Sequence, residues 1–114
     1  MKERTLGQLK TPISALGYGA MSFNDFYGPT DEEKSHAILD RCLDLGITHI
    51  DTSNVYGRGV SETRIGTYLA KRGKWVQDFF NIATKVGITT GPDGARCYDN
   101  SLQHIESELD KSLE

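Results

Sequence analysis

Asp51, Tyr56 and Lys85 are the residues whose types and spacing suit acid–base chemistry. Two apolar runs, residues 47–50 and 79–84, have the length and flanking turn residues of buried strands, and they lead directly to Asp51 and Lys85. Tyr56 lies in the loop after the first run. Because neighbouring parallel strands lie about 5 Å apart, we expect Asp51 and Lys85 to form an ion pair within reach of Tyr56.

A phenol beside an ammonium group is suited to donating a proton. The ordinary pKa of tyrosine is about 10, and a nearby positive charge favours the phenolate and lowers that pKa. Lys85 would supply this charge, and Asp51 would hold the ammonium in place and keep it protonated. Taken singly, each residue could instead cap a loop, pack or extend into solvent. Their shared strand edge favours a general acid–base site.

The elements around these residues alternate between strands and helices. A helix-like segment joins the two apolar runs, which is typical of a β-α-β unit with parallel strands. Turn and capping residues set the boundaries. The expected elements, in chain order, are a hairpin over 5–13 with Gly7 at its turn, a strand over 15–19, a loop over 21–29, a helix from the capping-box Thr30 to Gly46, a strand over 47–50, a helix capped by Ser61 that ends at Gly73, a strand over 79–84, a turn at 91–94 and a helix opened by Asp99 or Asn100.

Four motifs together resemble the aldo-keto reductase family. They are GITHIDTSNVYG at residues 46–57, IATKVG at 82–87, LGYGAM at 16–21 and SETRIG at 61–66. Each motif alone is a weak signal, but the linked set is specific and spans nearly the whole chain. The resemblance implies an α/β fold that is the amino-terminal portion of a (β/α)8 TIM barrel, with three strand–helix pairs preceded by a short β-hairpin.

The resemblance also implies a function. Members of the family reduce aldehydes or ketones to alcohols with NADPH, so NADP(H) is the expected cofactor and a small carbonyl compound is the expected substrate. The resemblance makes Tyr56 the proton donor and Lys85 and Asp51 its catalytic partners. The residues that it places beside the cofactor are Gly19, Ala20, Met21 and Asp51. The alternative is a non-catalytic fragment, or a binding protein like the potassium-channel β-subunits.

The length of the chain departs from the family pattern. A (β/α)8 barrel has about 250 residues, whereas this sequence has 114. We therefore expect one partial barrel domain over residues 1–114, cut within its third helix and incomplete as a catalyst. Helical spacing of apolar residues continues to the end without a stop signal. The residues that carry this spacing are Leu102, Ile105, Leu109 and Leu113.

The histidine that completes the family's site follows the fourth barrel strand. His36, His49 and His104 do not match that position, because the first and last lie on expected helices and His49 lies within a strand. A lone histidine without a paired motif is weak evidence of a site. We expect all three to be structural or solvated.

Two other nucleotide-binding patterns fail. Gly17 and Gly19 lie at the end of the expected strand, where phosphate-binding glycines can occur, and both a strand-to-loop turn and a cofactor contact remain open for them. The Rossmann pattern needs a third glycine and an immediate helix, but Ser22 stands at the third position. The Tyr-x-x-x-Lys pair of short-chain dehydrogenases is absent, since Val60 stands where Tyr56 would need a lysine.

Composition favours no other class of partner. The net charge of −3, with lysines and arginines scattered along the chain, gives no basic stripe for nucleic acid. No apolar run approaches the roughly 20 residues that span a bilayer, and the amino terminus lacks the apolar segment of a signal peptide. We expect a cytoplasmic protein.

Cysteines and aromatic residues give weaker signals. Cys42 lies on the apolar side of a helix and should pack in the core, whereas Cys97 should be an exposed free thiol. The two form no metal or redox motif. A group of aromatic residues suggests an aromatic wall to the substrate pocket: Phe23, Phe26, Tyr27 and Trp75.

Overall fold

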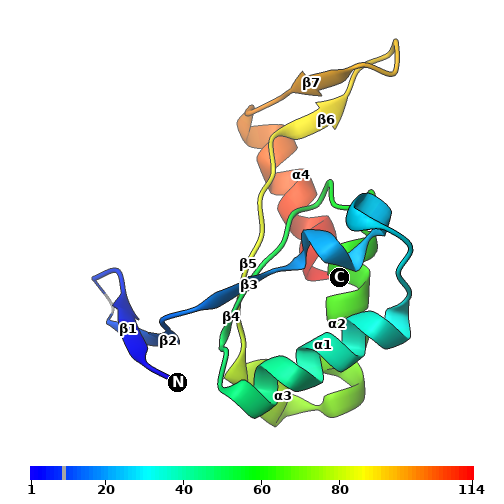
Figure 1. Ribbon diagram of the computed structural model, residues 1–114. Coiled ribbons are helices and arrows are strands. Elements are labelled where there is room, and N and C mark those ends of the chain that lie inside the picture. The colour runs from blue at the N-terminus through cyan, green and yellow to red at the C-terminus, as the bar shows by residue number, and fades with distance from the viewer. Residues whose placement is uncertain (9) are drawn as a thin grey trace.

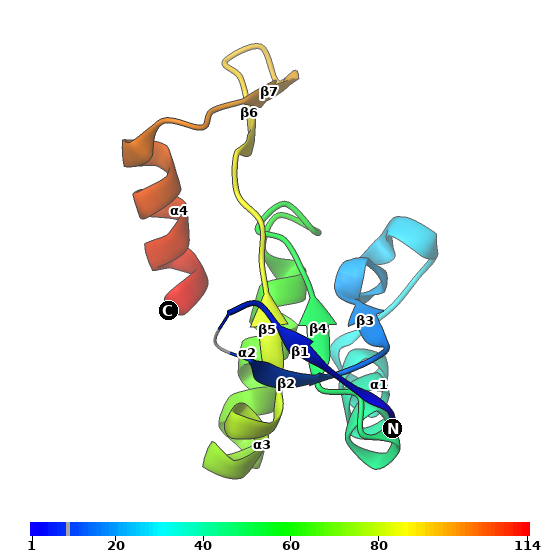
Figure 2. The same cartoon turned by 90° about the vertical axis from the view of Figure 1, so that its left-hand side faces the viewer.

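A parallel three-stranded sheet in the order β3-β4-β5 lies at the centre of the computed structural model, which describes residues 1–8 and 10–114 (Figure 1). Helices α1, α2 and α3 lie against one face of this sheet (Figures 1 and 2). The described elements, in chain order, are β1 (Glu3–Leu6), β2 (Thr11–Ser14), β3 (Gly17–Gly19), the 3-10 helices η1 (Ala20–Phe23) and η2 (Asp25–Tyr27), α1 (Glu32–Leu45), β4 (His49–Asp51), α2 (Val60–Arg72), α3 (Lys74–Phe79), β5 (Asn81–Ala83), β6 (Ile88–Thr90), β7 (Arg96–Tyr98) and α4 (Leu102–Leu113).

The register of the sheet places Gly19, Asp51 and Ala83 side by side in its last row. Alternate residues of a strand point to opposite faces. Ile50 is completely buried in the core that the helices cover, so Asp51 points to the other face. The single buried position of this short strand therefore fixes the direction of the acidic side chain that follows it.

Helix α1 begins one residue later than the sequence pattern predicts. Asp31, and not Thr30, is the N-cap, because its carboxylate accepts a hydrogen bond from the backbone N–H of Lys34 at 2.8 Å. Gly46 ends the helix as predicted, in the left-handed conformation with φ of 70° that favours glycine.

The hydrophobic core lies between the sheet and the helices. Tyr68 of α2 is buried in it, and its hydroxyl donates to the Asp40 carboxylate at 2.6 Å. Burial, together with this hydrogen bond, raises the pKa of Tyr68 far above its ordinary value. Cys42 packs here as predicted. The buried apolar residues are Ala20, Phe23, Leu39, Cys42, Ile50, Ile65, Tyr68, Val76 and Phe80.

Helix α2 differs from the prediction at its first residues and in the segment that follows its end. Gly59 is the N-cap residue, and the helix already includes Ser61, whose hydroxyl is used elsewhere. Gly73 ends α2 as predicted, but it also opens α3, a short helix that the sequence analysis assigned to no element. Because α3 extends to Phe79, the strand predicted over 79–84 is confined to β5.

The amino-terminal hairpin of β1 and β2 is confirmed, with Glu3 paired to Ser14 and Leu6 to Thr11. Leu9, which falls within the predicted hairpin, lies outside the described residues. Ser14 and Thr48 exchange two hydrogen bonds of 2.8 and 2.9 Å between backbone N–H groups and side-chain hydroxyls. These bonds attach the hairpin beside the amino end of β4, away from Asp51.

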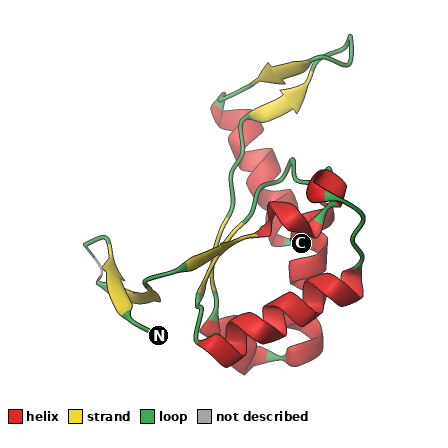
Figure 3. Ribbon diagram, in the orientation of Figure 1, coloured by secondary structure: helices red, strands yellow, loops and turns green. Residues whose placement is uncertain are grey.

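Helices or strands that were not predicted occur within or beside two segments predicted as a loop and a turn. Residues 21–29 contain most of η1 and all of η2. The predicted turn at 91–94 is present, with the Gly94 N–H donating to the Gly91 carbonyl at 2.9 Å, but it joins an antiparallel hairpin of β6 and β7 that was not predicted. Figure 3 shows this hairpin projecting from the carboxyl side of the central sheet. Cys97 in β7 is half-buried and not exposed.

Helix α4 follows the hairpin. Its N-cap is Ser101, which accepts from the backbone N–H of His104 at 3.3 Å, and neither Asp99 nor Asn100 serves as the cap. The predicted helical spacing is confirmed, although Leu102, Leu109 and Leu113 are exposed. Within residues 1–8 and 10–114, every helix is too short or too polar to cross a membrane.

Leu39 on α1 gives a test of this core. The Leu39→Ala change removes a side chain that is 1% exposed, so it should lower the free energy of unfolding by about 2–5 kcal/mol. Leu102→Ala is the control, because Leu102 is 72% exposed and its loss should change stability by no more than about 0.5 kcal/mol. Urea unfolding followed by circular dichroism measures both. Equal effects would contradict the assigned core.

Candidate active site

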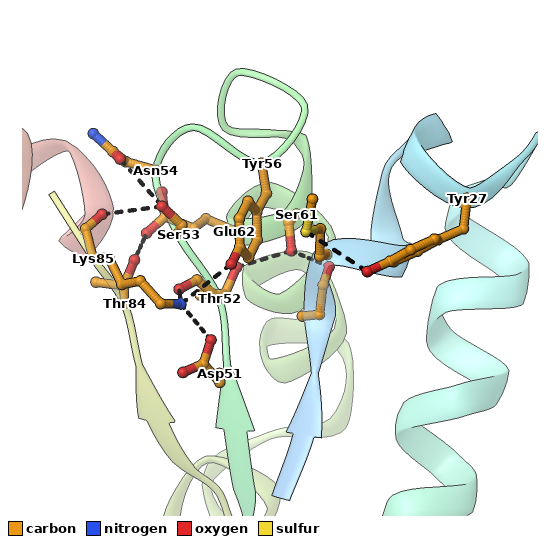
Figure 4. A network of polar contacts seen from close by, with 12 residues as sticks. Tyr27, Asp51, Thr52, Ser53, Asn54, Tyr56, Ser61, Glu62, Thr84 and Lys85 are labelled. Atoms are coloured by element: carbon orange, nitrogen blue, oxygen red, sulfur yellow. Dashed lines mark hydrogen bonds and ion pairs between the residues drawn. The ribbon is translucent and has the colours of Figure 1, made fainter. Parts of the chain in front are cut away.

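The three residues predicted to act together do meet at the carboxyl edge of the sheet (Figure 4). Asp51 is the last residue of β4, Lys85 follows β5 by two residues, and Tyr56 lies on the loop between β4 and α2. The Lys85 ammonium forms an ion pair with Asp51. It also donates to the Tyr56 hydroxyl at 3.4 Å and lies 5.0 Å from the centre of the Tyr56 ring.

Backbone hydrogen bonds hold the two strand ends together beyond the sheet. The N–H of Thr52 donates to the carbonyl of Ala83 at 2.8 Å, and the N–H of Asn54 donates to the carbonyl of Lys85 at 3.2 Å. The Lys85 ammonium in turn donates to the carbonyl of Thr52 at 2.7 Å. The loop that carries Tyr56 is therefore fixed to the segment that carries Lys85.

A buried network of hydroxyl groups supports this loop from below. Ser61 is completely buried, and its hydroxyl hydrogen-bonds the hydroxyl of Thr52 at 2.9 Å and donates to the carbonyl of Ala20 at 2.9 Å. It thus joins α2, η1 and the start of the loop that follows β4. Sequence analysis treated Ser61 only as a helix cap, although its place in a recognised motif was a signal of another role.

Two further contacts tie helices to the site. Glu62 of α2 accepts a hydrogen bond from the Thr84 hydroxyl at 2.5 Å, next to Lys85. Glu108 of α4 accepts from the Asn54 side-chain amide at 2.8 Å. Pattern analysis missed both contacts, because each joins residues that are more than 20 positions apart in the sequence.

The electrostatics of Lys85 favour the charged ammonium. Partial burial acts to lower its pKa, but the hydrogen bonds to Asp51 and Tyr56 outweigh burial, so the pKa is raised above its ordinary value. The side chains of Lys85 and Asp51 are 49% and 46% exposed. Exposed ion pairs contribute only about 0–1 kcal/mol to stability, so this pair serves mainly to orient the ammonium.

A pocket of about 450 Å³ opens over Tyr56 and Lys85. Of the four aromatic residues predicted to line a pocket, only Phe26 lines this one. Phe23 is buried in the core and Tyr27 is exposed to solvent. Trp75 is also exposed, on α3, which leads into the amino end of β5 and not its carboxyl end. The pocket lining consists of Met21, Asn24, Phe26, Ser53, Val55, Tyr56, Gly57, Lys85, Ile88 and Arg96.

The predicted cofactor-contacting residues have different positions. Gly19 lies beside Asp51 in the sheet, and among the described residues no atom lies within 4 Å of where a Cβ would stand. Met21 lines the pocket. Ala20 is completely buried and its carbonyl is bonded to Ser61, so its side chain is not available to a cofactor. The open sheet face at Gly19 and Asp51 fits a flat ring system.

The three histidines lie away from the pocket. His36 on α1 contacts the carbonyl of Arg64 at 3.0 Å, and His104 lies on α4. His49 lies on the same face of β4 as Asp51, away from the core, but two residues farther from the carboxyl edge of the sheet. In the part of the chain that the structure describes, the lining of the Tyr56 pocket includes no histidine.

Comparison with known proteins identifies the family. The family model described as aldo/keto reductase matches residues 15–114, so the chain belongs to the aldo/keto reductase family. An aldo-keto reductase of Schizosaccharomyces pombe, whose name gives NADP(+), is 37% identical over 102 residues, or 89% of this chain and 29% of that protein. L-galactose dehydrogenase of Arabidopsis thaliana is 32% identical over 111 residues, or 97% of this chain and 33% of that protein.

Solved structures agree with this assignment. The holo form of an aldo-keto reductase from Bacillus halodurans matches this chain with a TM-score of 0.80 at 35% identity. The match covers 99% of this chain and 35% of the Bacillus halodurans chain. Both the predicted family and the predicted fold class, the amino-terminal part of a (β/α)8 barrel, are confirmed. The chain spans about a third of the length of the relatives that it matches.

The raised pKa of Lys85 gives a test of its pairing with Asp51. Lysine is charged below its pKa, so a raised pKa extends the charged form to higher pH. Asp51→Asn removes the carboxylate while keeping its shape, and Lys85 should then lose its proton at lower pH. A 13Cε NMR titration of Lys85 measures this midpoint, with Lys34, a lysine of α1, as the internal control. An unchanged Lys85 midpoint would contradict the coupling.

Proposed function

We propose that this chain provides the proton-transfer part of an active site that reduces an aldehyde or ketone to an alcohol with NADPH. The observation that supports this proposal best is that Lys85 contacts both Asp51 and Tyr56 at the edge of a pocket that Tyr56 and Lys85 line. The cofactor named for the Schizosaccharomyces pombe relative supports the choice of NADP(H).

Tyr56 is the proton donor in this mechanism. Because the Lys85 ammonium donates a hydrogen bond to the phenol oxygen, the hydrogen of the phenol itself is left to point toward a carbonyl oxygen in the pocket. The cofactor supplies the hydride that the carbonyl carbon receives. The carbonyl oxygen takes the proton from Tyr56, so one hydride and one proton convert the carbonyl to an alcohol.

Lys85 and Asp51 stabilise the product state of this proton transfer. When Tyr56 has given up its proton, its oxygen carries a negative charge beside the Lys85 ammonium, and opposite charges at this distance attract. Asp51 holds the ammonium in place through their ion pair. The phenolate then takes a proton from solvent, which returns the site to its starting state.

Gly19, Met21 and Asp51 are the residues of this chain that would hold the nicotinamide end of NADP(H). The absence of a side chain at Gly19 leaves the sheet face next to Asp51 open to a planar ring, and Met21 adds an apolar wall. The matched relatives are about three times as long as this chain, so other parts of such a barrel would supply further cofactor contacts.

The size of the pocket and the charge of the chain indicate which kinds of partner it would bind. The substrate is a small carbonyl compound, because the pocket of about 450 Å³ matches a small molecule. The net charge of −3 argues against nucleic acid as a partner. We also propose a cytoplasmic location.

Tyr56→Phe tests the proton donor. Residues 1–114 are fused to the part of the Bacillus halodurans reductase that follows its matching segment, which gives a chimera with a whole barrel. The change keeps the ring and removes the hydroxyl, so we expect NADPH binding to persist and kcat to fall by a factor of about 10²–10⁴, the usual range for a lost general acid. Steady-state reduction of 4-nitrobenzaldehyde, read at 340 nm, measures this.

Tyr27→Phe is the matched control for this change, because Tyr27 is 73% exposed and lies outside the pocket lining. An unchanged kcat in the Tyr56→Phe chimera would show that Tyr56 is not the acid. Binding of NADPH by a chimera that reduces no aldehyde at all would favour the alternative of a binding protein.

Lys85→Met tests the stabilisation of the phenolate. The change removes the ammonium and keeps most of the aliphatic chain, so kcat should fall at least about tenfold, while the KM for NADPH changes little. Lys74→Met on α3 is the control, since the Lys74 side chain is 79% exposed and far from the pocket. Equal kcat values for the two lysine variants would rule out a catalytic role for Lys85.

A further inference from the structure

A second hollow adjoins the candidate active site. This groove has a volume of about 480 Å³ and lies between the loop that carries Tyr56, the β6–β7 hairpin and α4. It shares Val55, Ile88 and Arg96 with the lining of the Tyr56 pocket. A molecule whose carbonyl lies at Tyr56 can therefore extend along the shared wall into the groove.

Two arginines of the groove lack protein partners. Of the six arginines in the chain, four have hydrogen bonds or ion pairs: Arg4 with the Glu3 carbonyl, Arg41 with Asp44, Arg64 with the Phe23 carbonyl and Arg72 with Asp40. The side chains of Arg58 and Arg96 have neither among the residues that the structure describes, and both line this groove.

Neighbouring groups constrain the side chain of Arg96 and the backbone of Arg58. The Arg96 guanidinium lies over the Tyr98 ring at 5.5 Å, and a guanidinium that contacts an aromatic face keeps its edge N–H donors free for a ligand. Arg58 has a φ of 55°, which is rare outside glycine, and it lies in a tight loop where its N–H donates to the Val55 carbonyl at 3.2 Å.

The charge in the groove is positive although the chain is acidic overall. Among the described residues, Glu108 is the one acidic residue of the groove lining. Its carboxylate is already bound by Lys111 and Asn54, and these hydrogen bonds hold the pKa of Glu108 below its ordinary value. Glu108 therefore does not neutralise Arg58 and Arg96. A chain with a net charge of −3 keeps two uncompensated guanidiniums beside its candidate site.

We propose that Arg58 and Arg96 form an anion-binding subsite for the substrate, so that the reductase acts on carbonyl compounds that carry a carboxylate or phosphate. This inference rests on the proposed carbonyl reduction. Guanidinium groups bind both anions through paired N–H donors. The apolar side chains of Val55 and Ile88 line both the groove and the Tyr56 pocket, so the part of the substrate between its anion and its carbonyl would lie against apolar side chains.

Binding of the anion can be measured on the 114-residue chain without catalysis. The 15N-labelled protein is titrated with benzoate and, separately, with inorganic phosphate, and the Nε–Hε signals of the arginines are followed. We expect saturable shifts for Arg58 and Arg96 with at least one anion, and small shifts for Arg41 and Arg72. If the Nε–Hε signals of all arginines shift equally, or if none shifts, the proposed anion-binding subsite is wrong.

Kinetics on the active chimera test whether the subsite serves the substrate. The ratio of kcat/KM for 4-carboxybenzaldehyde to that for its neutral methyl ester reports a carboxylate, and the ratio for glyceraldehyde 3-phosphate to that for glyceraldehyde reports a phosphate. Arg96→Gln should lower one of these ratios about tenfold, the loss expected for a charge-assisted hydrogen-bonded pair. The ratio that falls identifies the anion.

Arg41→Gln on α1 is the control and should leave both ratios unchanged, whereas Arg96→Lys should restore part of the lost ratio by returning the charge. If neither ratio falls in Arg96→Gln, the substrate subsite is wrong. If the chimera reduces no carbonyl compound while benzoate or phosphate still shifts Arg58 and Arg96, the proposed function fails and the anion site stands as a binding site alone.

Discussion

The parallel pairing of β4 with β5 is the constraint on which the candidate site depends. Its register places Asp51 beside Ala83, and the hydrogen bonds continue past the strand ends, from Thr52 to Ala83 and from Asn54 to Lys85. A lysine two residues beyond its strand can then reach a carboxylate on the neighbouring strand. Without this extension of the pairing, Lys85 would be a mobile exposed side chain, and the phenol of Tyr56 would have no fixed neighbour.

The same pairing places the residues that stabilise the fold and those of the candidate site on opposite faces of the sheet. Alternate residues of β4 point to opposite faces, so Ile50 enters the core while Asp51 faces away from it. The core residues between sheet and helices stabilise the fold. The charged residues of the site are about half exposed and add little to stability. Ser61 links the two regions, because it is buried beneath the loop that carries Tyr56.

The sequence alone was sufficient for the grouping of Asp51, Tyr56 and Lys85 and for the order of the three parallel strands and of helices α1 and α2 between them. Both follow from strong local signals: apolar runs of strand length, a glycine at the end of α1 and polar residues directly after the strands. The fold class and the family also follow from the motifs, and the family model and the solved structures confirm them.

Other parts of the structure could not be predicted because tertiary contacts decide them. Thr30 and Asp31 can both cap a helix, and only the hydrogen bond to Lys34 distinguishes them. The 3-10 helices after β3 are held by contacts such as that of Arg64 with the Phe23 carbonyl, 41 residues apart. Strands β6 and β7 have three residues each, which is too short for an alternating pattern to be distinguished from a loop.

The unpredicted hairpin supplies part of the wall of the pocket at the candidate site. Sequence patterns were sufficient to locate the groups proposed to react, because these are a few side chains at one sheet edge. Selectivity depends on the walls around those groups, and here a wall comes from β6 and β7, which bring Ile88 and Arg96 to the edge of the Tyr56 pocket. The residues proposed for the chemistry therefore come from short motifs on the central sheet, whereas part of the pocket wall comes from a hairpin whose position only the folded structure defines.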